Sequence, residues 1–239
     1  MVNWFWRRRP KRVDAPKLRP RSEDAALATR LELAELAPPV DRFLGQAAYV
    51  QLSLFEDLSR LVALAPTLAA KESLSQASAV SLNRYSGLTA EIRRTGGEPS
   101  TAMQPYTGGV DFFQKVTQGT DFYQGLMTSH ITAGILDDFF ARLALGLPAA
   151  EAARVTPLYD PSHEQLLADL LRAGIAADPR LAARLAMWGR RLVGDAMLVA
   201  RASLATPPAS EKDEARVEPV FTELIAAHTR RMDALGLTA

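Results

Sequence analysis

Apolar side chains recur every three or four positions along most of the chain after residue 40. Between residues 41 and 64 they include Phe43, Leu44, Leu54 and Leu58. This spacing places apolar side chains on one face of an α-helix. The pattern therefore predicts an amphipathic helix over about 41–64, which Pro66 would end because proline cannot continue a helix.

The same spacing predicts more helices along the rest of the chain. Longer ones are expected at about 67–94, 120–145, 160–175, 178–204 and 217–235, and shorter ones at 23–36 and 111–116. The dipeptide Asp-Pro begins two of these stretches, at Asp160 and at Asp178. Because Asp is favoured at the N-cap and Pro at the first helical position, both are expected to start helices. No stretch reads as a strand.

The lengths of the connections suggest an architecture. The first two long helices are joined tightly, whereas residues 96–119 form a long connection to the third. One long crossover of this kind is typical of ferritin-like four-helix bundles. We therefore expect an all-α, ferritin-like four-helix bundle with a long crossover between helices two and three, plus extra C-terminal helices. Another all-α bundle remains the alternative.

This organisation divides the chain into three parts. Residues 1–37 form a basic, aromatic arm with a short helix, residues 38–205 form the bundle, and residues 206–239 form a polar linker and a C-terminal helix. The final helix is expected to pack on its own bundle or on a partner. A homodimer through the bundle faces is also compatible with the sequence.

Composition excludes several classes of function. The 239 residues include no cysteine, which excludes disulfides, cysteine-ligated zinc, iron–sulfur clusters and thiol catalysis. The motifs G-x-S-x-G, G-x-G-x-x-G and the Walker loop are missing, which argues against the hydrolases and nucleotide-binding proteins that carry them. No apolar run approaches the ~18 residues that span a bilayer. A cytoplasmic location is the expectation.

The formal net charge of +1 conceals two oppositely charged parts. Residues 1–21 contain eight basic residues and one acidic residue, a net charge of +7, which leaves −6 for residues 22–239. The arm begins with an aromatic block followed by a basic one, comprising Trp4, Phe5, Trp6, Arg7, Arg8, Arg9, Lys11 and Arg12. Aromatic residues favour the membrane interface and basic ones favour anionic lipid. The arm therefore predicts peripheral contact with an anionic membrane surface. RNA is the second candidate partner, and a solvated tail without a partner is the alternative to both.

Two segments resemble a known family. The stretch 177–194 reads ADPRLAARLAMWGRRLVG, and the stretch 226–237 reads AAHTRRMDALGL. Both resemble an actinobacterial family of ferritin-like proteins that is grouped with the MiaE-type hydroxylases of isopentenylated adenosine in tRNA. The resemblance covers about residues 38–237. It implies a ferritin-like fold and raises the question of a diiron centre.

Diiron proteins of this type bind their metals with one Glu from each of two helices and a Glu-x-x-His pair from each of the other two. The resemblance lets these ligand positions be compared with this chain. They are occupied by Gln51, by Ser81 and Arg84, by Ala133, and by Asp160 and His163. An amide, a cation and a methyl group are poor substitutes for carboxylates, so we expect a degenerate site and no cofactor.

Three classes of function follow. The favoured one is a non-catalytic binding or scaffold protein. The second is a diiron tRNA-modifying hydroxylase with unusual ligands, and a rearranged site built from His130, Asp137 and His163 would serve it. The third is an adaptor that acts through its arm on a membrane or on RNA. If Arg84 pairs with a carboxylate such as Asp137 inside the bundle, a structural polar cluster has replaced the metal site.

Overall fold

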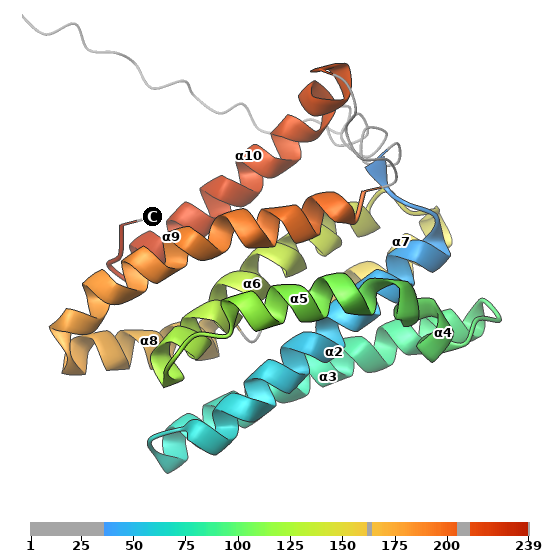
Figure 1. The fold of residues 1–239 in the computed structure, drawn as a ribbon. Coiled ribbons are helices and arrows are strands. Elements are labelled where there is room, and N and C mark those ends of the chain that lie inside the picture. The colour runs from blue at the N-terminus through green and yellow to red at the C-terminus, as the bar shows by residue number, and fades with distance from the viewer. Residues whose placement is uncertain (1–35, 162–163, 205–210, 239) are drawn as a thin grey trace, which may run out of the picture.

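The computed structural model describes residues 36–161, 164–204 and 211–238, and all regular structure in these ranges is helical (Figure 1). The basic arm and His163 lie outside the described residues, as does nearly all of the short helix expected at 23–36. Statements about side chains exclude residues 211–216 as well.

Four helices form the bundle. They are α2 (Val40–Leu64), α3 (Leu68–Arg94), α6 (Phe122–Ala144) and α8 (Glu164–Ala177). Helix α2 packs against α3 and α6, and α8 packs against the same two helices, which closes the ring. The connection from α3 to α6 is long, as predicted, so the all-α ferritin-like arrangement is confirmed.

The crossover is more helical than the sequence suggested. It contains α4 (Pro99–Met103), the 3-10 turn η1 (Gln104–Tyr106) and α5 (Thr107–Thr117). We expected only a short helix at 111–116, and glycine pairs such as Gly108 and Gly109 are usually found in turns. Both glycines instead lie in the first turn of α5, and this helix packs on α2 and α9.

A second connection, from α6 to α8, corrects the expectation for Asp160. It contains α7 (Ala149–Val155) and the 3-10 turn η2 (Thr156–Tyr159), neither of which was predicted. Asp160 follows η2 with an extended backbone, and α8 begins at Glu164. Asp160 is therefore not the N-cap of a helix that starts at Pro161, because Pro161 is not helical.

The remaining helices, α9 (Pro179–Ala202) and α10 (Glu211–Ala234), pack outside this ring. Asp178 is the N-cap of α9, as predicted, because its side chain accepts a hydrogen bond from the Arg180 N–H. Helix α10 begins six residues before the expected 217, so the predicted linker is shorter than 205–216. Its docking on α6 shows that α10 packs back on its own bundle.

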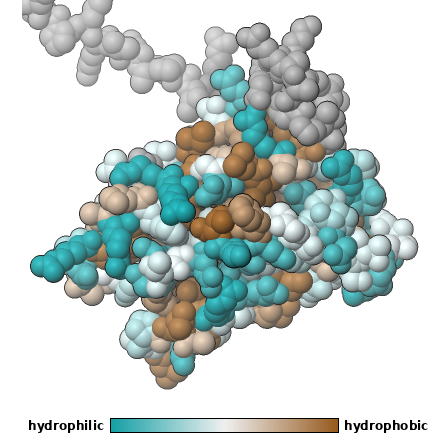
Figure 2. All heavy atoms as spheres, in the orientation of Figure 1, coloured by the Kyte–Doolittle hydropathy of each residue, from teal (hydrophilic) through white to brown (hydrophobic). Residues whose placement is uncertain are grey.

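The core consists of two groups of buried residues along the bundle. One contains Phe43, Phe139 and Phe140, and the other contains Leu126 and Ile131. On the outside, Figure 2 shows mixed hydrophilic and hydrophobic residues, with hydrophobic ones gathered near the middle of the visible face. Among the described residues, no helix has both the length and the apolar character needed to cross a bilayer.

Candidate functional site

Arg84 lies in the interior of the bundle and is only 3% exposed. Each of its three nitrogens donates a hydrogen bond. Nη1 donates to Oδ2 of Asp137 at 2.5 Å, Nε donates to the Leu158 carbonyl at 2.8 Å, and Nη2 donates to the Asp160 carbonyl. The buried guanidinium is therefore neutralised by a carboxylate and hydrogen-bonded through each of its nitrogens, which offsets the cost of burying its charge.

Gln51 completes this group from the adjacent helix α2. Its Nε2 donates to Oδ1 of Asp137 at 2.6 Å, and both side chains are buried. Gln51 belongs to α2, Arg84 to α3 and Asp137 to α6, while the Asp160 carbonyl belongs to the segment that leads into α8. We refer to Gln51, Arg84 and Asp137 as the central polar cluster, which links three bundle helices to the approach of the fourth.

Tyr159 covers the guanidinium of Arg84. The Cζ of Arg84 lies 5.7 Å from the centre of the Tyr159 ring, and this ring stacks on Phe140. Burial, followed by the nearby negative charge of Asp137, raises the pKa of the Tyr159 hydroxyl well above its usual value of 10.0. The phenol therefore stays protonated and acts as an apolar and cation–π cover for the cluster.

A small cavity adjoins the central polar cluster. Its volume is about 30 Å³, and its lining includes His130, Ala133, Tyr159 and two members of the cluster. A cavity needs roughly 10–15 Å³ to hold a water molecule, so this one has room for very few. It is too small for a nucleotide-sized substrate.

The structure brings some of the predicted site residues together and leaves others apart. Gln51, Arg84 and Ala133 meet at the cluster or its cavity, as the helix phasing suggested. Ser81 is fully buried, and its Oγ has no hydrogen-bond partner among the residues described. Asp160 reaches Arg84 through its backbone carbonyl. His163 is outside the described residues, so its position in the site is not assigned.

The side chains at these positions do not fit a diiron centre. Two iron ions need several carboxylate and imidazole ligands, but the cluster offers one carboxylate, Asp137, which already accepts from Arg84 and Gln51. The guanidinium of Arg84 carries a permanent positive charge that repels metal cations. In the described part of the chain, no three His, Asp or Glu side chains are grouped as metal ligands would be.

A second buried arginine was missed at the sequence level. Adjacent basic residues such as Arg230 and Arg231 usually lie on a solvated face, but the side chain of Arg231 is only 11% exposed. Its Nε donates to Oε1 of Glu164 at 2.8 Å, and its Nη2 donates to Oδ2 of Asp138 at 2.7 Å. These two ion pairs attach α10 to α8 and α6.

The sequence did contain a signal for this contact. In α10 the buried positions include Leu224, Ala227, His228 and Met232, and Arg231 falls between them on the same helix face. A basic residue on the apolar face of a helix indicates that it pairs with an acidic residue inside the protein. On α6, the guanidinium of Arg231 packs closely against Gly134. A Cβ added at Gly134 would lie 2.8 Å from the Arg231 Nε.

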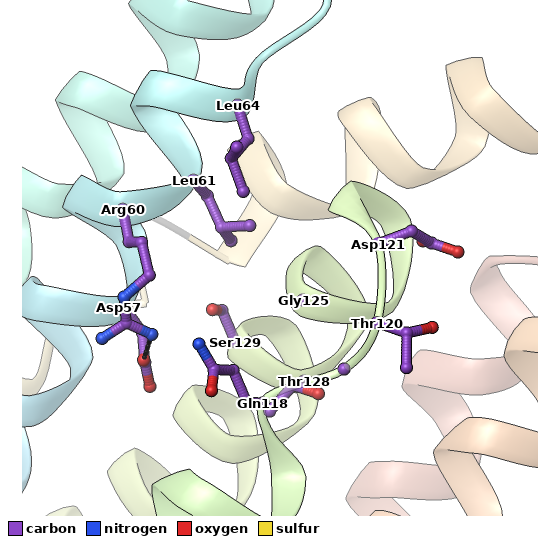
Figure 3. Close-up of a pocket in the computed structure, with 11 residues that line it drawn as sticks. Asp57, Arg60, Leu61, Leu64, Gln118, Thr120, Asp121, Gly125, Thr128 and Ser129 are labelled. Carbon is purple, nitrogen blue, oxygen red and sulfur yellow. Dashed lines mark hydrogen bonds and ion pairs between the residues drawn. The ribbon is translucent and has the colours of Figure 1, made fainter.

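A larger polar cavity lies between the end of α2 and the start of α6, and its volume is about 230 Å³ (Figure 3). Asp57 and Arg60 of α2 form an ion pair of 2.8 Å on one side, and Gln118 and Ser129 face them. Burial is the largest influence on Asp57 and raises the pKa of its carboxyl group. The cavity offers both donors and acceptors, but its described lining contains no histidine to act as a base.

The comparison with known families agrees with this architecture. A family model described as a ferritin-like domain of actinomycetes matches residues 36–207, which is more than half of the chain. The chain therefore belongs to this ferritin-like family. A search of curated proteins gave no match.

Proposed function

We propose that this chain is a ferritin-like scaffold without diiron oxygenase chemistry, and that its basic N-terminal arm brings the scaffold to an anionic membrane surface. The observation that carries the first half is the buried guanidinium of Arg84, bound to Asp137 at 2.5 Å. It occupies a position where the diiron relatives discussed above would place a metal ligand.

The central polar cluster supports a structural role at that position. A diiron centre ties the four helices of a bundle together through its ligands. Arg84 ties the same helices by donating to Asp137 and to the Asp160 carbonyl, while Gln51 donates to Asp137 from α2. The cross-link is retained, whereas the positions that would bind dioxygen are lost with the metal ligands.

The competing assignment is a diiron tRNA hydroxylase of the MiaE type with unusual ligands. It would need ligands beyond the central polar cluster and a path for a modified nucleoside. The adjoining cavity, of about 30 Å³, is too small for such a substrate. These two features favour the scaffold.

Iron content tests the first half directly. The full chain would be purified from iron-replete cells, and its metals would be measured by mass spectrometry. The scaffold predicts well under one iron per chain, whereas the hydroxylase predicts two. Two tightly held irons per chain would overturn the proposal.

The second half is supported by the order of residues in the arm. Trp4, Phe5 and Trp6 precede the basic residues as one block, which suits an interface where rings insert and charges face lipid headgroups. Each Lys or Arg near an anionic surface adds about 1 kcal/mol of attraction. For RNA, aromatic and basic residues are more useful when interleaved, because bases and phosphates alternate.

Vesicle binding tests this half. Changing Arg7, Arg8 and Arg9 to Gln should weaken binding of the full chain to phosphatidylserine-containing vesicles by at least tenfold. A matched control changes Arg190 and Arg191 to Gln, which are exposed basic residues of α9. If both variants bind as the unmodified chain does, the arm has no such role. Loss of RNA binding with unchanged vesicle binding would favour RNA.

A further inference from the structure

A groove runs between α5 and α9 on the face shown in Figure 2. Its volume is about 340 Å³, within the range of roughly 300–1,000 Å³ that is usual for ligand pockets. Its walls are mainly apolar and include Val110, Phe112, Phe113, Val116, Leu198 and Val199. In Figure 2 hydrophobic residues gather in this region of the surface.

The walls of the groove expose large apolar side chains on both sides. Phe112 of α5 and Leu198 of α9 are each 66% exposed. Single exposed apolar residues are common on protein surfaces, but a group that lines a concave surface marks a binding site. Aromatic side chains are well suited to fill it, because they bury a large apolar area with few rotatable bonds.

One charged residue lines this groove, and it specifies the kind of occupant. Asp195 of α9 is half-buried in the lining and forms no ion pair within the described ranges. The other polar groups in the lining, from Gln46 and Tyr106, are neutral. The groove therefore suits a segment that carries aromatic rings beside a positive charge.

We propose that the occupant is the arm of the same chain, with Trp4, Phe5 and Trp6 in the groove and an arginine of 7–9 facing Asp195. This inference rests on the proposed role of the arm. The arm has a net charge of +7 and the remainder of the chain −6, so the attraction between them is favourable over the whole body.

The arm is long enough to reach the groove. The described chain begins at Leu36, and Gln46, which lines the groove, belongs to α2. A helical rise of about 1.5 Å per residue places Gln46 about 9 Å along α2 from Val40. The 29 residues from 7 to 35 can span up to roughly 95 Å at about 3.3 Å per residue. The tether also gives the arm a high effective concentration at the groove.

Docking in the groove would compete with binding to a membrane. The same three aromatic residues would serve the groove and the lipid interface, so they occupy only one at a time. The body would then hold the arm until an anionic surface of sufficient charge displaces it. This competition sets the affinity of the whole chain for such a surface.

Cross-linking tests where the arm lies, and the absence of native cysteine makes it specific. The full chain would carry Asn3→Cys together with Gly109→Cys, since Gly109 lines the groove and an added Cβ there meets no atom within 4 Å. The control pairs Asn3→Cys with Met187→Cys. Met187 lies on α9, one of the two helices beside the groove, and is 67% exposed, but it is not part of the groove.

Under mild oxidation at low protein concentration, the groove pair should form an intramolecular disulfide at least ten times faster than the control pair. Equal rates would overturn the proposal. Disulfide-linked dimers in preference to cross-linked monomers would overturn it too, because they would assign the groove to a second copy.

Vesicle binding provides the second measurement. Leu198→Asp should release the arm and increase binding to phosphatidylserine vesicles several-fold, whereas Met187→Asp should leave it unchanged. Identical binding of both variants and the unmodified chain would overturn the competition. If the arginine replacements in the arm leave vesicle binding unchanged, the membrane role fails, and the cross-linking rates still decide whether the arm occupies the groove.

Discussion

Arg84 acts as the centre of the bundle interior because every nitrogen of its guanidinium has a partner. Those partners come from α6 and from the segment before α8, so one side chain holds elements that are distant in sequence. Buried charge pairs contribute little net stability compared with apolar residues of similar size, but removing one partner leaves the other charged and buried. Replacing both members of the pair and replacing only one should therefore have different effects on stability.

Arg84→Met should lower the free energy of unfolding by about 3–5 kcal/mol, because the buried Asp137 would lose the positive charge of Arg84. Combining it with Asp137→Leu should recover a large part of this loss, since neither charge of the pair remains. Urea unfolding measures both. The control is Arg60→Met, whose exposed pair with Asp57 contributes about 1 kcal/mol or less. A loss at Arg84 no larger than at Arg60 would contradict a central structural role.

His228 of α10 is a second buried polar residue with a measurable consequence. It is 3% exposed, and neither ring nitrogen has a hydrogen-bond partner in the part of the chain that is described. Burial, and then the positive charge of Arg231, lowers the pKa of His228 below its usual 6.5. The folded state therefore binds fewer protons at this site than the unfolded state.

The stability that neutral His228 contributes is present in full above about pH 6.5 and is lost as the pH falls towards its lowered folded pKa. His228→Leu should remove this dependence, by up to about 1.4 kcal/mol per pH unit in that interval. The measurement is the difference in unfolding free energy between the two proteins at several pH values from 8 to 5. Other titrating groups cancel in that difference, and a constant difference would refute the prediction.

At the scale of elements, sequence signals worked where the determining interactions are local. The Asp178-Pro179 start of α9 is set by neighbouring residues and was correctly predicted. The same dipeptide at Asp160 did not start a helix, because Arg84 binds the Asp160 carbonyl from another helix. Non-local contacts of this kind cannot be read from spacing.

In the candidate site, too, local signals were informative and non-local contacts were missed. Gln51 and Arg84 were placed inside the bundle correctly because helix periodicity determines which face a residue occupies. The burial of Arg231 was missed because its partners, Glu164 and Asp138, come from two other helices. Charge alone suggested solvent exposure, whereas the apolar spacing around Arg231 contained the better signal.

The crossover between α3 and α6 depends on a close approach at Gly45. A Cβ at this position would lie 2.2 Å from the carbonyl oxygen of Ala102, in the backbone of α4. Gly45→Ala should therefore destabilise the protein by about 1–3 kcal/mol, because α4 would have to shift away from α2. Thermal or urea unfolding measures the change.

The matched control for Gly45→Ala is Gly194→Ala in α9. An added Cβ at Gly194 meets no atom within 4 Å, so only helix propensity changes. This substitution should stabilise the protein by about 0.5–1 kcal/mol. The two substitutions are chemically identical and are expected to differ in sign. Equal effects on stability would mean that α2 and α4 can accommodate a side chain at Gly45, which would contradict the prediction.

At the scale of the whole molecule, α10 is part of the folded core although the sequence separates it from the bundle. The family match ends at residue 207, before α10, and a polar linker precedes the helix. Yet Leu224 is buried in one group of core residues and Met232 in the other. The boundary of the family domain is therefore not a boundary of the core, and α10 belongs to the folded body.

Truncation after Leu204 tests this integration of α10 with the bundle. It removes the buried side chains of Leu224, Met232 and Leu235 and the Arg231 ion pairs, and it uncovers apolar surface on α6. Each fully buried side chain of this kind contributes about 1.5–3 kcal/mol. We expect the truncated chain to unfold at a much lower urea concentration and to bind the dye ANS. Unchanged stability without ANS binding would make α10 a separable appendage, and the bundle alone would then be the folding unit.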